Sequence, residues 1–354
     1  MPTWVDWVFR LLILALAFCR VNLRGGQVNR RDTVCALAAL GAAPLVAVAQ
    51  QAQKVPVIGF LHPGLPGIAG TNPAAMATRK SLRQNGFIDG ETVKIEYRWG
   101  QGKPETLAGF AAELVRLKVD AIVAVGSASV LAAKTATSLV PIIAADLETD
   151  PVASGLVATL ARPKGNVTGL FLDQADMAAK WLQLMKEVLP SAQRVAVLWD
   201  ANSGPYQRNA ITTAAKAMSV DLRILEFRDL AGLDSVLTLG LKDRPQALVQ
   251  LSSPLISQFG NRIAEFLATH HLPGISPFRE FPTSGGLMSY GPNRTLFFDR
   301  LGYYISRITK GVPAGELPVE QPTHFEFVVN LKTAKGLGIK LPISVLTRAD
   351  ETIE

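Results

Sequence analysis

Polar side chains that could hold a small charged molecule follow a series of short apolar runs in this chain. Hydroxyl groups and the free N–H groups at the start of a helix can bind a carboxylate, whereas carboxylate side chains can bind an ammonium group. Where parallel strands end at one edge of a sheet, such side chains gather at one place. The candidates at these positions are His62, Gly64, Ser127, Ser129, Asp150, Asn202, Ser203, Ser253 and Glu280.

Each candidate also has a purely structural interpretation. For Ser127 and for Ser129, capping a helix and binding a ligand are equally open roles. Asp150 precedes a proline, which is the pattern of a helix cap. Asn202, Ser203 and Ser253 could each have either a structural or a ligand-binding role. Only their shared location at strand ends favours a binding site. For a buried ammonium group, Glu280 is the favoured acidic partner, although Arg279 could pair with it instead.

The sequence patterns of common enzymes are missing where they would be needed. Glycines 64, 67 and 70 follow the first apolar run without forming a G-x-G-x-x-G fingerprint, and neither a P-loop nor a G-x-S-x-G elbow occurs. The four histidines lack metal-ligand spacing, and the pair at 270–271 fits the end of a helix. We therefore expect a binding protein without catalytic residues, cofactor or metal.

Short apolar runs alternate with amphipathic segments from residue 54 onward. Runs rich in Val and Ile indicate buried parallel strands at 55–61, 93–97, 121–125 and 141–145, and strand-like runs recur at 194–199, 222–227, 247–251 and 272–275. Helical patterns occur at 105–118, 178–189, 206–218 and 256–270. This order predicts two doubly wound α/β units. Apolar segments at 167–171, 274–278 and 318–329 are where the chain is expected to cross between them.

The first 49 residues have the pattern of an export leader. Arg30 and Arg31 precede an apolar run that ends with small residues at Ala49, so signal-peptide cleavage is expected after Ala49. A retained membrane anchor is the alternative, but the run from 33 to 49 contains a proline and is short for a span. A second apolar stretch lies upstream, which leads to the hypothesis that translation begins at Val28.

Cysteine and charge content narrow the range of partners. Both cysteines, Cys19 and Cys35, lie in the leader, so the mature chain is expected to have no disulfide, thiolate metal site or catalytic thiol. The leader holds five Arg and two Asp, which leaves +4 of the formal +7 charge for residues 50–354. This balance predicts no nucleic-acid partner. With the cleaved leader, it indicates a periplasmic protein, which we expect to be a monomer.

The mature chain resembles the ABC transporter substrate-binding proteins whose best-known members are linked to tryptophan and tyrosine uptake. The segments that carry the resemblance are 57–61 (VIGFL), 95–99 (IEYRW), 112–115 (AELV), 161–170 (ARPKGNVTGL), 278–281 (FREF), 285–292 (GGLMSYGP), 317–323 (LPVEQPT) and 330–335 (NLKTAK). One of these segments contributes Tyr290 as a further candidate ligand-binding residue.

The resemblance implies a type I periplasmic-binding fold, in which two Rossmann-like lobes are joined by three crossover segments and hold a small polar solute between them. The lobes are expected at 54–170 plus 278–320 and at 171–277 plus 321–354. An ABC permease in the inner membrane is the implied docking partner, and an α-amino acid, aromatic or branched, is the implied ligand. At 200–202, Asp-Ala-Asn stands where relatives often have Asn-Pro, which leaves ligand identity open.

Other functions are compatible with the same pattern. An aromatic acid or a nucleoside-like solute would also suit a polar cleft, and a periplasmic sensor could present its ligand to a membrane receptor. A LacI-type regulator shares the fold but needs a DNA-binding helix-turn-helix where this chain has its leader. A secreted Rossmann-like enzyme would need a nucleophile–base pair or a cofactor loop.

Overall fold

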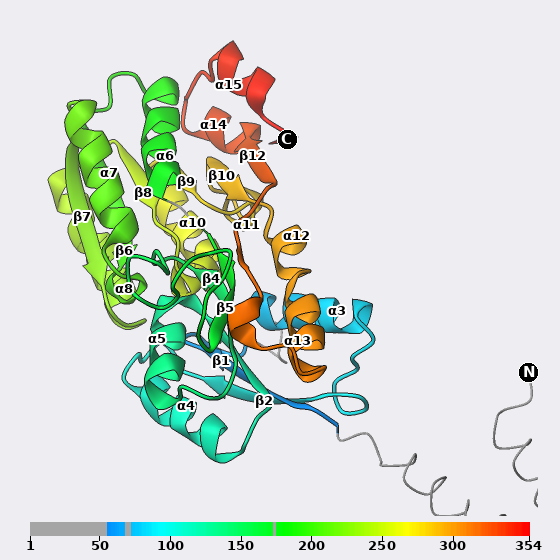
Figure 1. Ribbon diagram of the computed structural model, residues 1–354. Helices are drawn as coiled ribbons and strands as arrows, with labels where there is room; N and C mark the ends of the chain where they lie inside the picture. The colour runs from blue at the N-terminus through cyan, green and yellow to red at the C-terminus, as the bar shows by residue number, and fades with distance from the viewer. Residues whose placement is uncertain (1–54, 68–71, 173–174) are drawn as a thin grey trace, which may run out of the picture. The chain divides into compact units, whose positions relative to one another are not determined.

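The structure is a computed structural model that describes residues 55–67, 72–172 and 175–354 (Figure 1). The leader at 1–49, with the expected cleavage after Ala49, the start at Val28 and both cysteines, lies outside the described residues. No helix within the described ranges is long and apolar enough to cross a membrane.

In the described part of the chain, six strands form a parallel sheet in the order β11-β5-β4-β3-β1-β2. They are β1 (Val57–His62), β2 (Lys94–Trp99), β3 (Ala121–Val125), β4 (Ile142–Leu147), β5 (Val167–Phe171) and β11 (Val319–Glu320). The inner strands are almost wholly buried, as expected when helices cover both faces. One face is covered by α4 (Thr106–Arg116) and α5 (Gly126–Ala136), and the other by α3 (Pro73–Gln84), α12 (Arg294–Phe298) and α13 (Leu301–Thr309).

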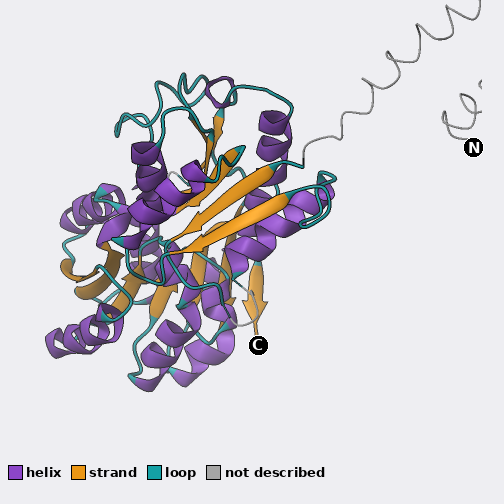
Figure 2. Cartoon of the chain, turned by 90° about the horizontal axis from the view of Figure 1, so that it is seen from below, coloured by secondary structure: helices purple, strands orange, loops and turns teal. Residues whose placement is uncertain are grey.

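Seven further strands of the described residues form a second sheet in the order β13-β12-β10-β9-β8-β6-β7, in which only β10 and β12 are antiparallel neighbours. They are β6 (Arg194–Asp200), β7 (Asp221–Phe227), β8 (Ala247–Gln250), β9 (Gly274–Ser276), β10 (Met288–Pro292), β12 (Phe325–Asn330) and β13 (Glu351–Ile353). Helices flank the strands of both sheets (Figure 2).

The helices of the second sheet also divide between its two faces. The first face carries α6 (Ala175–Val188), α7 (Tyr206–Ala217), α14 (Leu331–Gly336) and α15 (Ile343–Arg348). The opposite face carries α8 (Gly232–Gly240), α9 (Pro254–Gln258), α10 (Gly260–Thr269) and α11 (Glu280–Thr283). Ser253 caps α9 and Asn293 caps α12 through their side-chain oxygens, which fixes the first turns of the helices that follow β8 and β10.

We call the six-stranded sheet with its helices the first lobe, and the seven-stranded sheet with its helices the second lobe. Among the described residues the chain passes between the lobes three times, after β5, after β10 and between β11 and β12. The expected fold of two doubly wound lobes with three crossovers is therefore confirmed, and the crossings expected around 167–171 and 318–329 agree with the structure.

The crossing expected at 274–278 is wrong. β9 and β10 are parallel neighbours in the second sheet, and the short helix α11 connects them, so the chain stays in the second lobe until Pro292. As a consequence β10 belongs to the second sheet, although it lies within the segment 278–320 that was expected in the first lobe. The sequence signal misleads here because a short apolar strand looks the same whether it ends in one sheet or passes to another.

Candidate ligand-binding site

The carboxyl ends of strands in the two lobes lie against each other. A cavity of about 10 Å³ between them is lined by Ser127 and Glu148 from the first lobe and by Asn202, Ser203 and Leu255 from the second. This is room for at most one water molecule. Around Ser127 and Asn202 the two lobes are therefore in direct contact.

Hydrogen bonds join the two lobes across this contact. Gln258 of α9 accepts from the backbone N–H of Leu65 at 2.9 Å and donates to the carbonyl of Leu65 at 2.7 Å. The Thr149 hydroxyl donates to the carbonyl of Ser203 at 3.1 Å. The partners in each bond belong to different lobes, so these bonds form only when the lobes meet.

Two glycines allow this close approach. A Cβ atom on Gly64 would lie 2.0 Å from Oε1 of Gln258. Gly126 has a φ of +77°, and a Cβ atom there would lie 2.6 Å from Cγ of Pro254 in the second lobe. Because proline is rigid, a side chain on Gly126 would hold the lobes apart.

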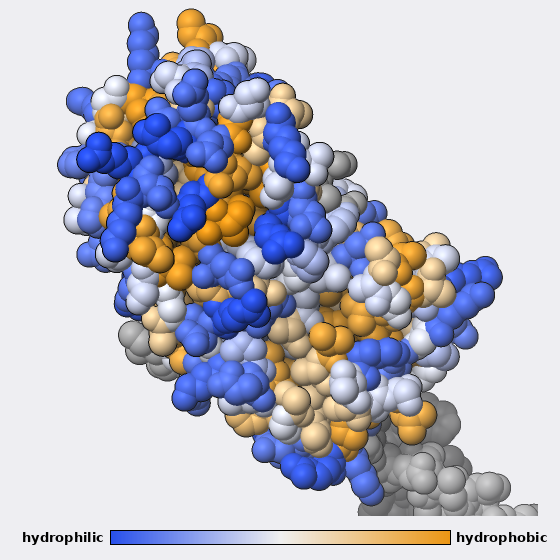
Figure 3. Space-filling model, turned by 90° about the vertical axis from the view of Figure 1, so that its left-hand side faces the viewer, coloured by the Kyte–Doolittle hydropathy of each residue, from blue (hydrophilic) through white to orange (hydrophobic). Residues whose placement is uncertain are grey.

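A surface groove of about 570 Å³ borders the small cavity on the side of α4 and α5. It shares Ser127 and Asn202 with the cavity and extends over Leu131 of α5 to Pro205 of the second lobe. Figure 3 views the molecule from the side of α4, α5 and α7, where hydrophobic patches lie among hydrophilic residues. The groove therefore connects the small cavity between the lobes to this face of the molecule.

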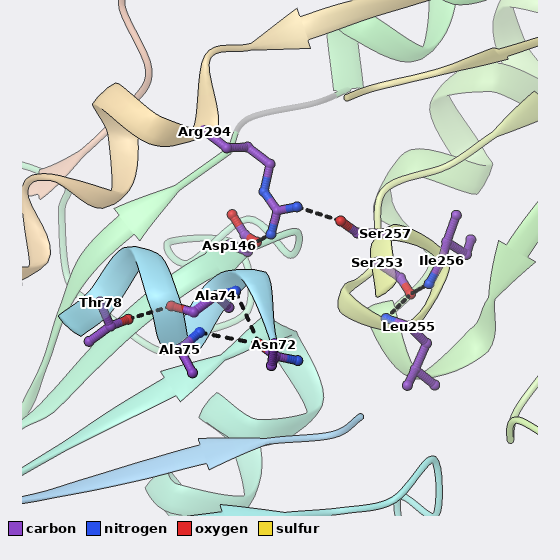
Figure 4. Close-up of polar contacts among 10 residues, drawn as sticks. All are labelled: Asn72, Ala74, Ala75, Thr78, Asp146, Ser253, Leu255, Ile256, Ser257 and Arg294. Carbon is purple, nitrogen blue, oxygen red and sulfur yellow. Dashed lines mark hydrogen bonds and ion pairs between the residues drawn. The ribbon is translucent and has the colours of Figure 1, made fainter. Parts of the chain in front are cut away.

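Arg294, in the first turn of α12, connects the two lobes (Figure 4). One of its terminal nitrogens lies 2.6 Å from a carboxylate oxygen of Asp146 at the end of β4, and the other donates to the hydroxyl of Ser257 on α9. The side chains of Arg294 and Asp146 are only 10% and 3% exposed. The guanidinium carbon also lies 4.5 Å from the centre of the Phe278 ring. This is a buried charge pair held on several sides.

The charges near Arg294 are not balanced one to one. Burial alone would lower the pKa of Arg294, but the carboxylates of Asp146 and Glu280 raise it. Burial raises the pKa of Asp146, and the charge of Arg294 opposes this shift. Oδ1 of Asp146, Oε2 of Glu280 and Nε of Arg294 are buried without a hydrogen-bond partner among the described residues. Both the carboxylates and the guanidinium of this group therefore have polar atoms that are free to bind a ligand.

Glu148 follows β4 and is fixed by Ser127. The backbone N–H and the hydroxyl of Ser127 both donate to Oε2 of Glu148 at 2.8 Å, and the same hydroxyl accepts from the N–H groups of Glu148 and Thr149. Burial raises the pKa of Glu148 to about 8 against these hydrogen bonds. Ser127 thus binds the neighbouring strand end and does not cap its own helix, whose start has no side-chain cap.

His62 is the last residue of β1. Its Nδ1 accepts from the backbone N–H of Gly64 at 2.9 Å, and its ring packs against Phe60 and Trp99. Burial, helped by the positive charge of Arg294, lowers the pKa of His62 to about 3. The imidazole is therefore neutral at physiological pH.

In the second lobe the polar candidates are organised around Asp200, the last residue of β6. Ser253 donates to Oδ2 of Asp200 at 2.9 Å, the Asn202 side chain donates to Oδ1 at 2.9 Å, and the Ser203 hydroxyl donates to the backbone carbonyl at 2.7 Å. Burial raises the pKa of Asp200, and the hydrogen bonds from Asn202 and Ser253 counteract the shift. The sequence candidates Asn202, Ser203 and Ser253 therefore lie together.

The other candidates are more dispersed. Ser129 is fully buried on α5, and its hydroxyl has no partner in the described part of the chain. Asp150 caps a turn by accepting from the N–H groups of Val152 and Ala153. Tyr290 packs against Phe325 and Phe327 in the second sheet. Contact of any of these candidates with a ligand stays a prediction.

Sequence reasoning missed Arg294 and Gln258, and it did not single out Asp146 and Glu148, which follow the apolar run at 141–145. One signal was available for Arg294. Asn293 is a good helix cap, and a cation immediately after such a cap opposes the helix dipole, so another partner must hold it there. For the other three, the partners lie in distant parts of the sequence.

Comparison with known proteins decides the family. The sequence matches the family described as ABC transporter substrate binding protein over residues 71–353. The chain belongs to this family. A substrate-binding protein of this kind binds a small-molecule solute and docks with an ABC permease.

Several relatives resemble this substrate-binding protein over most of their length. A tyrosine-binding protein of Clostridioides difficile strain R20291 is 27% identical over 281 residues, which cover 74% of this chain and 75% of the relative. A conserved domain protein of Vibrio cholerae has a TM-score of 0.75, and an ABC domain of Streptococcus pneumonia in complex with L-Trp has a TM-score of 0.72. Both structures are 22% identical and cover 84% of this chain and 100% of their own. These similarities confirm the type I periplasmic-binding fold.

Proposed function

We propose that this substrate-binding protein captures an aromatic α-amino acid between its two lobes and delivers it to an ABC permease. The observation that carries the proposal is the buried group formed by Arg294, Asp146 and Glu280 where the lobes meet. The lobes open and close about the three crossovers, and contacts made to both lobes favour the closed state.

The charges of this group favour a ligand with an ammonium group. Asp146 and Glu280 contribute two carboxylates beside the single guanidinium of Arg294. Glu148, with its pKa of about 8, is mostly protonated at neutral pH, and His62, with its pKa of about 3, adds no charge. An ammonium group would pair with the carboxylate that Arg294 leaves without a positive partner, whereas an aromatic acid without this group would place a further carboxylate beside the two present.

The names of two relatives support the proposal that the ligand has an aromatic side chain. One curated relative is named a tyrosine-binding protein, and one solved relative holds L-Trp. We further propose that the mature protein begins at Gln50 and works in the periplasm as a monomer, without catalysis and without a nucleic-acid partner. The leader pattern and the transport role of the family support this assignment.

Thermal unfolding of the protein, stripped of bound ligand by unfolding and refolding, tests the ligand class. L-Tyr at 100 times its dissociation constant should add about 2.7 kcal/mol of stability. The matched control is 3-(4-hydroxyphenyl)propionate, which keeps the phenol and the carboxylate but lacks the ammonium group. Equal stabilisation by this acid, or none by L-Tyr, L-Trp and L-Phe, would contradict the proposal.

A further inference from the structure

Three polar side chains lie side by side in the second sheet, where β8 and β9 end, apart from the charged group at Arg294. Gln250 ends β8, Ser276 ends β9, and Ser289 of β10 pairs with Ser276. The residues just before Gln250 and Ser276 are themselves paired, so β8 and β9 are in register. Because paired residues on neighbouring parallel strands point to the same face, these three side chains form one row, which we call the polar row.

The polar row faces α9 and α11, two helices of the second lobe that border the charged group. Leu248, two residues before Gln250 on β8, packs in one cluster with Leu255 of α9 and Phe281 of α11. Those two helices also carry Ser257, which accepts from Arg294, and Glu280. The polar row and the charged group therefore border the same helices.

Phe278 provides a direct link between the two groups. Its backbone N–H donates to the Ser276 hydroxyl at 3.4 Å, and its ring lies 4.5 Å from the Arg294 guanidinium carbon. One short loop after β9 thus connects the polar row to the charged group.

Two members of the polar row are buried without hydrogen bonds. Gln250 is 1% exposed and Ser289 is fully buried. Neither amide atom of Gln250, nor the hydroxyl of Ser289, has a partner within the residues that the structure describes. Leaving a buried polar group without a partner costs free energy, because its hydrogen bonds to water are lost and not replaced. Apolar residues of similar size would stabilise this sheet better, so the polar side chains need a reason other than folding.

The chemistry of the row points to the group that it would bind. The Gln250 amide offers both a donor, Nε2, and an acceptor, Oε1. A carboxylate only accepts, and would leave Oε1 without a donor. A hydroxyl group donates and accepts at once, and can satisfy both atoms or share them with Ser289. The row carries no charge, so it suits a neutral group.

We infer that the polar row is a second subsite, which binds the phenolic hydroxyl of a tyrosine-like side chain while the charged group at Arg294 binds the ammonium end. This inference rests on the proposed function and deepens it, because it predicts a preference for tyrosine over phenylalanine and assigns that preference to Gln250 and Ser289. Phenylalanine in the same position leaves the Gln250 amide unpaired.

Isothermal titration of the ligand-stripped protein with L-Tyr and L-Phe tests the inference. The parent should bind L-Tyr at least about 30-fold more tightly, because an analogue that lacks the hydroxyl leaves buried polar groups unpaired. In Gln250→Leu the ratio should fall to within about 3-fold, through weaker binding of L-Tyr and unchanged or tighter binding of L-Phe. Ser289→Ala should lower the ratio in the same direction.

Gln246→Leu is the matched control, because this glutamine lies just before the opposite end of the same strand and bonds to the backbone of Gln193 and Arg194. It should keep the parent ratio. Binding of both amino acids with an unchanged ratio in Gln250→Leu and Ser289→Ala would overturn the subsite alone. Binding of no amino acid by the parent would overturn the proposed function and the subsite with it.

Discussion

Arg294 lies 2.6 Å from Asp146, although 148 residues separate them in the sequence. Arg294 stands where the chain leaves the second lobe, and Asp146 ends a central strand of the first sheet. The same guanidinium donates to Ser257 of the second lobe. One buried side chain therefore binds both lobes. Substitutions at this contact should change both the stability of the protein and its binding of ligand.

Arg294→Met should destabilise the protein by about 3–5 kcal/mol, because it leaves the buried Asp146 carboxylate without its partner. Urea unfolding measures this change. Arg300→Met is the control, since Arg300 forms a bidentate pair with Glu320 but is 43% exposed. The control should cost at most about 1 kcal/mol. Equal losses in the two variants would show that burial of the Arg294 pair has no special effect.

Glu280→Gln should weaken binding of L-Tyr by about 2 kcal/mol or more, as expected when one partner of a desolvated charge pair is removed. Its Oε2 atom is buried and has no partner among the described residues, so the unliganded protein should melt at nearly the parent temperature. Asp150→Asn is the comparison, because the Asp150 side chain caps a turn. If Asp150→Asn loses affinity for L-Tyr and Glu280→Gln does not, then Asp150 and not Glu280 binds the ammonium group.

The pH dependence of stability should contain a contribution from Glu148. Its pKa is about 8 in the folded protein, against an ordinary value of 4.5 for the unfolded chain, so the folded state holds a proton that the unfolded state releases. The resulting stability is complete below pH 4.5 and is lost as pH rises toward 8. Its slope reaches about 1.4 kcal/mol per pH unit.

The range from pH 6.5 to 8 isolates this effect. His62 acts in the opposite sense at lower pH, because its pKa falls from 6.5 to about 3 on folding and stability is lost as pH decreases below 6.5. Urea unfolding of Glu148→Gln across pH 6.5–8 should show a flatter profile than the parent. Parallel profiles would mean that Glu148 is ionised in the folded protein.

Ser127→Ala should destabilise the unliganded protein by about 1–3 kcal/mol, because the Ser127 hydroxyl holds the Glu148 carboxylate and accepts from two backbone N–H groups. Ser129→Ala, two residues further along α5, removes a buried hydroxyl without a partner in the described chain and should be neutral or stabilising. Chemical denaturation of both variants measures the difference. If Ser127→Ala weakens ligand binding but leaves stability unchanged, its hydroxyl contacts the ligand instead.

Gly126→Ala should hinder closure of the lobes. The new methyl group meets Pro254 of the second lobe and also strains a backbone with a φ of +77°. Gly155→Ala carries the same kind of strain, at a φ of +72°, but its methyl group has no neighbour within 4 Å among the described residues. Small-angle scattering with saturating ligand should therefore give a larger radius of gyration for Gly126→Ala alone. The same radius in both variants would show that Gly126 does not limit closure.

The sequence by itself determined the alternation of elements. Strands such as β1, β3 and β4 are continuous apolar runs because helices cover both faces of a parallel sheet, and α4 shows the helical spacing of its buried residues Leu107, Ala111 and Leu114. Such burial patterns are local, so the two doubly wound lobes could be predicted. The same local rules placed Asn202, Ser203 and Ser253 at strand ends, where the structure brings them together around Asp200.

Only the tertiary structure decided which polar groups are partners. The sheet that holds β10 depends on its pairing with β9 and β12, and no local pattern specifies a pairing partner. Ser127 finds Glu148 across 21 residues, and Arg294 finds Asp146 across 148. A short-range pattern reports whether a side chain is buried, but the charge that balances it comes from whichever distant strand end the fold brings beside it.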